Sequence, residues 1–267
     1  MTTPFSADVL VVGSGVAGAL VAAKLAATGV KVCIMEAGAP VNRTEAVQTY
    51  WKALIKVPES AYPPVPQAMH PLTHEPKGWY QQSGPDLFKS TYLKLVGGTT
   101  WHWLGTCLRL LPSDFALHTR YGRGLDWPIS YAQLEPFYGQ AEQELGVSGD
   151  MADDLGSPRS SAFPMAKIPP SYLDTVMGRA LEDSPYQVRS TPQARNSEFR
   201  DERMACCGSS SCIPVCPVQA KYDATVHLGK AVAAGAMLLE RSTAVQLDVG
   251  PDGLISSVRF RRWDNSE

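Results

Sequence analysis

The first 36 residues alternate strand, glycine-rich turn, helix and strand, and this order constrains the fold more than any other feature. An apolar run at 7–12 (ADVLVV) has the composition of a buried strand, and it leads directly into GSGVAG at 13–18, the glycine turn. The Ala- and Leu-rich segment 17–28 predicts a helix, and 31–36 (KVCIME) predicts a second strand. A β-turn-α-β unit of this length indicates a parallel α/β sheet.

The glycine turn matches the G-x-G-x-x-G pattern of dinucleotide-binding folds. We expect Gly13 to permit the tight turn, Gly15 to let a pyrophosphate approach the backbone, and Gly18 to let the helix pack closely on the sheet. The helix N-terminus supplies N–H groups and the positive end of a dipole. Glu36, 18 residues after Gly18, is placed to accept hydrogen bonds from ribose hydroxyls. The alternative is a turn that binds no nucleotide.

The pattern alone does not separate NAD from FAD. The motif opens the chain, and the next strands typical of a nucleotide-binding domain come roughly 200 residues later. An NAD-binding Rossmann domain normally continues with further β-α units, so this arrangement favours FAD.

Charge and hydropathy argue against nucleic-acid binding and against a bilayer-spanning segment. The chain has 24 Lys and Arg against 26 Asp and Glu, a formal charge of −2, which leaves no electrostatic basis for nucleic-acid binding. The longest uncharged apolar run, 9–23, has 15 residues, fewer than the roughly 20 that span a bilayer. Because MTTPFSAD at the start has no Lys or Arg, we expect no signal peptide.

A second glycine pair, Gly97 and Gly98, precedes TTWHW at 99–103. The pair lets a backbone run close to a flat ligand. Thr99 offers a hydroxyl, Trp101 a ring face, and His102 a titratable pair of nitrogens. These residues suit the floor of a pocket, and they suit equally well a core turn whose aromatic side chains simply pack.

Four of the six cysteines lie in CCGSSSCIPVCP at 206–217. Thiolates bind soft metals and iron–sulfur clusters. Adjacent Cys206 and Cys207 point in different directions, so three ligands, as in a [3Fe–4S] cluster, are favoured over four. Structural zinc and disulfides are the alternatives. Cys33 lies in a predicted strand, and we expect it in the core.

The remaining periodicity predicts a mixture of helices and strands. We expect helices at 45–54, 131–145 (with Ser130 as N-cap), 171–181 and 224–234, strands at 237–240, 243–249 and 254–262, a turn at 250–253, and loops at 58–76 and 146–170. The sequence stops directly after a strand, which we interpret as an incomplete sheet.

These motifs together resemble the glucose–methanol–choline flavoprotein oxidoreductases. The resemblance is carried by the glycine turn, Glu36 and VGGTTWHWLGTCLR at 96–109. Three further segments narrow it to the large flavoprotein subunit of bacterial membrane-bound glucose, sorbitol, fructose and gluconate dehydrogenases: LLPSDF at 110–115, LDWPIS at 125–130 and LEPFY at 134–138. The resemblance extends from residue 7 to about 262.

The resemblance implies an α/β fold, namely an FAD-binding Rossmann-like domain of the glutathione-reductase type. It carries an iron–sulfur insertion and is truncated before the antiparallel substrate-domain sheet is complete. Four segments are implied: a first part of the FAD-binding domain at 1–45, flavin-contacting and cap or linker segments at 46–204, the cysteine segment at 205–222, and a return to the FAD-binding domain at 223–267.

The resemblance also implies roles for individual residues. The implied cofactor-binding set is Gly13, Gly15, Gly18, Glu36, Gly97, Gly98, Thr99, Trp101, His102 and Val245, the last through backbone contact with adenine. In some relatives a histidine in the place of His102 is bonded covalently to the flavin. Cys206, Cys212 and Cys216 would ligate a [3Fe–4S] cluster. Cys207 is then spare, either paired with Cys107 or present as a buried thiol.

The implied activity is oxidation of a CH–OH group of a sugar, polyol or sugar acid. Electrons would pass from FAD through the cluster to a cytochrome or quinone. The implied partners are a multihaem cytochrome c and a small export-chaperone subunit. Both would act at the periplasmic face of the inner membrane, which the chain would reach only through its partners; a cytoplasmic protein is the alternative.

The family's catalytic histidine, with its neighbouring Asn or second His, matches nothing in this sequence, so no catalytic residue is assigned. His70, His74, His118 and His227 receive no role. Two other functions stay open: a truncated, catalytically silent FAD-binding fragment, and an NAD-dependent Rossmann enzyme with a zinc site.

Overall fold

A computed structural model describes residues 5–62, 85 and 93–263, and the chain divides into two compact units. Unit 1 comprises 1–103, 211–217 and 223–267, and unit 2 comprises 104–210 and 218–222. These units cut across the four implied segments. The glycine pair at 97–98 belongs with the N-terminal turn, whereas the cysteine segment is shared between the two units.

Unit 1 is built on a parallel sheet with the strand order β1-β2-β5. β1 (Val9–Val12) pairs with β2 (Val32–Met35), and β2 pairs with β5 (Met237–Leu239). Every residue of β2, including Cys33, is buried, because β2 is the central strand. The helix α1 (Val16–Ala27) connects β1 to β2, and α6 (Thr225–Ala233) precedes β5. The predicted parallel α/β arrangement is therefore confirmed.

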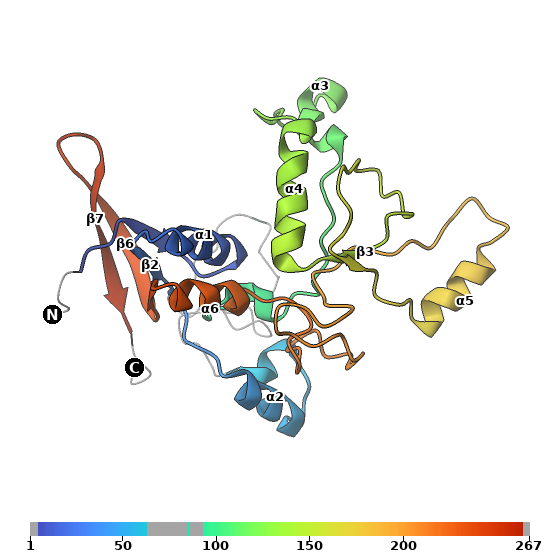
Figure 1. Ribbon diagram of the computed structural model, residues 1–267, viewed down its shortest axis with the longest axis horizontal. Coiled ribbons are helices and arrows are strands. Elements are labelled where there is room, and N and C mark those ends of the chain that lie inside the picture. Colours follow the sequence, from blue (N-terminus) through green and yellow to red (C-terminus); the bar gives the residue numbers. More distant parts are fainter. Residues whose placement is uncertain (1–4, 63–84, 86–92, 264–267) are drawn as a thin grey trace. The chain divides into compact units, whose positions relative to one another are not determined.

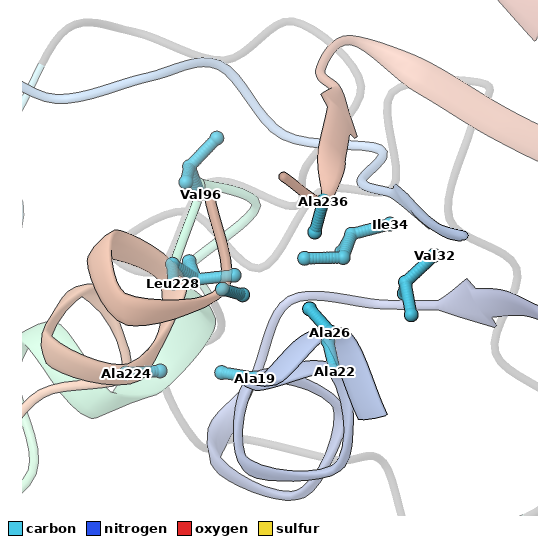
Figure 2. Close-up of a cluster of buried hydrophobic side chains, with 10 residues drawn as sticks. Ala19, Ala22, Ala26, Val32, Ile34, Val96, Ala224, Leu228 and Ala236 are labelled. Carbon is cyan, nitrogen blue, oxygen red and sulfur yellow. The ribbon is translucent and has the colours of Figure 1, made fainter. Parts of the chain in front are cut away.

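Small side chains allow helices to pack closely in the core of unit 1. Ala19, Ala22 and Ala26 recur at helical spacing on one buried face of α1. Figure 2 shows this face directed toward β2 and α6, where it joins Ile34 and Leu228 in one cluster. The cluster fixes the position of α1, and so of the turn that precedes it.

The other elements of unit 1 are α2 (Arg43–Lys52), the 3₁₀ helices η1 (Pro58–Ala61) and η2 (Gly98–Trp101), and the antiparallel hairpin of β6 (Ser242–Val249) and β7 (Ile255–Arg262) (Figure 1). The helix α2 and the hairpin lie close to their predicted places, whereas η1 lies in a stretch predicted to be a loop and no helix was predicted at η2. The helix α2 begins earlier than expected because the Asn42 side chain accepts a hydrogen bond from Glu45 N at 3.2 Å.

Unit 2 contains helices and one short pair of strands, connected by long irregular segments. Its elements are η3 (Pro112–Ala116), α3 (Leu117–Tyr121), α4 (Tyr131–Leu145), α5 (Tyr172–Ala180), and the short parallel strands β3 (Ser148–Gly149) and β4 (Met165–Ala166). The predicted N-cap of α4 is confirmed, since the Ser130 hydroxyl accepts from Gln133 N at 3.3 Å. The pair β3–β4 lies in the stretch predicted to be a loop.

A buried ion cluster holds the interior of unit 2. Arg109 donates from Nε to Glu142 at 2.8 Å and from Nη1 to Glu135 at 2.9 Å. Arg159 donates to the other oxygen of Glu142 at 2.5 Å. The cluster ties α4 to the chain on either side of it. Across the part of the chain that the structure describes, no helix is long and apolar enough to cross a membrane.

Candidate dinucleotide site

Two glycines of the turn are required by the protein's own structure. Gly13 has φ 95°, in the left-handed region that favours glycine, and its N–H donates to Met35 O at 2.8 Å. A Cβ on Gly18 would overlap the carbonyl oxygen of Gly13. The tight turn and the close packing of α1 therefore depend on these residues in the way the motif predicts.

Gly15 has no such role. Its φ of −66° is open to any residue, and an added Cβ would meet no atom within 4 Å. It is the N-cap of α1, which has no side-chain capping bond and no acidic residue in its first turn. The N–H groups there and the positive helix dipole favour an anion. A glycine that neither backbone nor packing requires fits the close approach of a pyrophosphate.

Glu36 follows β2 and is fixed beside the turn. Its side chain is buried, and one carboxylate oxygen accepts from Ser14 N at 2.8 Å and from Ser14 Oγ at 2.6 Å. The other oxygen accepts from Gly38 N at 2.6 Å. The acid predicted to bind ribose thus lies at the same edge of the sheet as the glycine turn.

A third segment reaches the turn from 83 residues further along the chain. Gly97 N donates to Ser14 Oγ at 2.9 Å, and a Cβ on Gly98 would lie 3.9 Å from Gly15 Cα. Both glycines of the pair have positive φ, 93° and 59°. Their backbone therefore runs against the glycine turn, as expected for a segment that approaches a flat ligand.

The other predicted cofactor residues of this segment differ in their exposure to solvent. Trp101 is buried, donates from its indole nitrogen to Val96 O at 2.8 Å, and packs its ring against Tyr62. This is the core packing given above as the alternative for the aromatic residues. His102 is also buried, whereas Thr99 is exposed.

Val245 lies on β6 at a break in the ladder with β7. The register passes from the pair Ala244–Phe260 to the pair Gln246–Arg259, which leaves Val245 at a bulge. A bulge residue is left outside the regular ladder. The backbone contact expected of Val245 stays a prediction.

Two anchoring residues were not predicted. The Arg43 guanidinium pairs with buried Asp223, donates to Cys216 O at 3.1 Å, and lies 4.5 Å from the Trp101 ring centroid. The Thr100 hydroxyl donates to Gly97 O at 2.6 Å and accepts from Ala224 N at 2.9 Å. No local pattern indicates such pairs, because the hydrogen-bond partners of Arg43 are more than 170 residues away.

The predicted cluster ligands are divided between the units. Cys212 and Cys216 belong to unit 1, and Cys206 belongs to unit 2. Within the described residues, no group of three or more His, Cys, Asp or Glu side chains is arranged to hold a metal ion. The soft thiolate donors suit an iron–sulfur cluster in chemistry, but this ligand set stays a prediction.

The prediction that Cys207 pairs with Cys107 or is a buried thiol is wrong. Cys107 and Cys207 are both free thiols, so they do not form a disulfide. Cys207 is exposed, so it is not a buried thiol. Cys107 is half-buried, and this burial raises the pKa of its thiol to about 11. Of the unassigned histidines, His227 is buried in α6 and His118 lies in α3, while His70 and His74 lie outside the described residues.

Comparison with known proteins identifies the segment that contains the glycine turn and Glu36 as FAD-binding. The FAD binding domain family matches residues 8–51. The fructose dehydrogenase large subunit of Gluconobacter japonicus is 34% identical over 265 residues, 96% of this chain and 48% of that protein. The 2-methyl-1,2-propanediol dehydrogenase of Mycolicibacterium austroafricanum is 30% identical over 254 residues, 92% of this chain and 44% of that protein.

A third relative, the gluconate 2-dehydrogenase flavoprotein of Pantoea cypripedii, is 29% identical over 236 residues, 71% of this chain and 35% of that protein. The chain thus spans at most about half the length of the curated relatives it matches.

Proposed function

We propose that this chain, which belongs to the glucose–methanol–choline family of flavoprotein oxidoreductases, is the FAD-binding part of a dehydrogenase for a CH–OH group of a sugar, polyol or sugar acid. The observation that carries the proposal is the meeting of the glycine turn, Glu36 and the Gly97–Gly98 pair at the uncapped N-terminus of α1. The names of the relatives, which include fructose and gluconate dehydrogenases, support the substrate class.

The chain's own residues would bind and orient the cofactor. The N–H groups of the first turn of α1 would face the pyrophosphate, and Glu36 would accept from the ribose hydroxyls. The backbone at Gly97 and Gly98 would allow the rest of the cofactor to lie close to the protein. FAD, when bound, supplies the capacity to accept a hydride from an alcohol carbon.

The proposal extends to an electron route beyond FAD. Cys206, Cys212 and Cys216 would hold a [3Fe–4S] cluster that passes electrons singly to a cytochrome or quinone. The close spacing of the cysteines supports the cluster. One relative is named as a large subunit, which supports the presence of partner subunits. For these we propose a multihaem cytochrome c and a small export chaperone at the periplasmic face of the inner membrane.

A matched pair of glycine substitutions tests the FAD site. Gly15→Ala adds a methyl group that meets no protein atom but lies where the pyrophosphate is proposed to approach. We expect a folded protein with only a small change in thermal stability, and at least about tenfold weaker FAD binding, measured by flavin fluorescence. Gly229→Ala, on an exposed face of α6 with equally open space, should bind as the wild type does. Equal affinity of Gly15→Ala and the wild type would refute the site.

Turnover separates the dehydrogenase from a second candidate. A catalytically silent cofactor-binding fragment is favoured by one observation, the roughly half-length coverage of the relatives. The chain reconstituted with FAD and iron would be assayed with fructose, gluconate and a 1,2-diol, using a dye acceptor. Reduction of the dye supports the dehydrogenase. Bound flavin without dye reduction for any of the three substrates supports the fragment.

A further inference from the structure

Ser14, the residue between the first two glycines of the turn, connects three segments that are far apart in sequence. Its side chain is completely buried. The hydroxyl donates to Glu36 Oε2 at 2.6 Å and accepts from Gly97 N at 2.9 Å. The sequence separations are 22 and 83 residues. One small side chain therefore ties both the ribose-side acid and the second glycine pair to the turn.

This double role needs a group that donates and accepts at once. A hydroxyl has one proton and two lone pairs, so it can serve Glu36 and Gly97 together. Without it, Glu36 would still accept from two backbone N–H groups, those of Ser14 and Gly38. Gly97 is buried, and its N–H would lose the acceptor that the structure gives it. Removal of the Ser14 hydroxyl would therefore weaken the hydrogen bonding of Gly97 more than that of Glu36.

We propose that Ser14 is a positioning residue that couples the ribose end of the FAD site to the Gly97–Gly98 backbone. This inference rests on the proposed function. FAD would touch Glu36 and the glycine turn with its ADP half and would extend along the Gly97 segment with its flavin half, which ADP lacks. Coupling through Ser14 then contributes to FAD affinity and little to ADP affinity.

The ratio of the two affinities tests the proposal. For Ser14→Ala we expect the Kd for FAD to rise about tenfold and that for ADP to rise less than about twofold, measured by calorimetry. The matched control is Thr28→Ala. It removes a hydroxyl at the other end of α1 that only donates to Leu25 O at 2.8 Å, and it should change neither Kd.

The outcomes separate the inference from its premise. A wild-type chain that binds neither ligand would overturn the proposed function. Wild-type binding of both, with FAD and ADP weakened equally in Ser14→Ala, would show a purely structural serine and overturn the inference.

A measurement on the wild type covers the case in which Ser14→Ala does not fold. Saturating adenosine, which has the ribose but no phosphate, should slow amide hydrogen exchange in a peptide that covers Gly97, because Ser14 transmits the restraint from Glu36. Unchanged exchange at Gly97 in the presence of bound adenosine would contradict the coupling.

Discussion

The glycine turn and the cysteine segment are both distinctive local patterns, yet only the glycine turn lies within one compact unit. Everything the turn requires lies in unit 1, where backbone N–H groups, Ser14 and Glu36 hold one another in place. The cysteine segment is divided between two units, and the described residues contain no group arranged to hold a metal ion. The difference lies in the kind of ligand that each pattern supplies.

A site made of backbone N–H groups is completed by the fold itself. Strand pairing, helix packing and a few hydrogen bonds are enough to aim the donors at one place. Thiolates carry charge and repel one another, so such ligands usually come together with their metal, and binding and folding are coupled. We therefore expect the first site to exist before its cofactor and the second to form with its cluster.

The largest expected effect concerns iron. Replacing Cys206, Cys212 or Cys216 with Ser removes one of three proposed ligands, and we expect each variant to lose its iron completely after reconstitution. Cys207→Ser, the adjacent control, should retain the wild-type iron content, because Cys207 is proposed to be spare. Iron per chain is measured by elemental analysis. Loss of iron in Cys207→Ser, with retention in Cys206→Ser, would reverse the assignment.

A substitution in unit 2 tests whether FAD recognition belongs to unit 1. Glu142→Gln removes the carboxylate that pairs with both Arg109 and Arg159 and leaves Arg109 with Glu135, so it should cost about 3 kcal/mol of unfolding free energy in urea. FAD affinity measured below the unfolding transition should not change. The control Asp150→Asn breaks an exposed pair with Lys167 and should have little effect. Weaker FAD binding by folded Glu142→Gln would show that the site is not confined to unit 1.

Thiol reactivity tests whether Cys107 and Cys207 are free thiols that differ in exposure. Burial raises the pKa of Cys107 to about 11, so at pH 8 its thiolate fraction is about 100-fold below that of an ordinary cysteine. Iodoacetamide followed by mass spectrometry should label exposed Cys207 early and Cys107 much later, without prior reduction. Labelling of Cys107 should accelerate about tenfold per pH unit between pH 8 and 10, because only the thiolate reacts. Labelling of both only after reduction would restore the disulfide.

The smallest effect separates two glycines of one motif. Gly18→Ala places a Cβ against Gly13 O and should destabilise the protein by about 2 kcal/mol in urea. Gly15→Ala should cost less than about 1 kcal/mol, since its Cβ meets open space and only the N-cap preference for glycine is lost. Equal stability losses would mean that both glycines serve packing alone.

Local patterns predicted the parts of this fold that depend on neighbours in sequence. The β1-α1-β2 unit, the Ser130 cap of α4 and the turn between β6 and β7 each follow from a few adjacent residues. The core position of Cys33 follows from the apolar run around it.

Long-range pairing could not be predicted in the same way. Arg43 and Asp223 are 180 residues apart, and neither has a distinctive neighbourhood. The two compact units also depend on such contacts, and they separate Cys206 from Cys212 although only five residues lie between them. Spacing indicates which chemistry a segment could support, but the distant contacts decide which residues share a compact unit.

The central claim is that FAD binds where the glycine turn, Glu36 and the Gly97–Gly98 pair meet. Amide hydrogen exchange of the chain with and without saturating FAD tests it most directly. The account predicts slower exchange in three separate peptides, covering 13–18, 36–38 and 97–102, and little change in unit 2. Bound FAD with protection confined to unit 2, or absent from all three peptides, would contradict it.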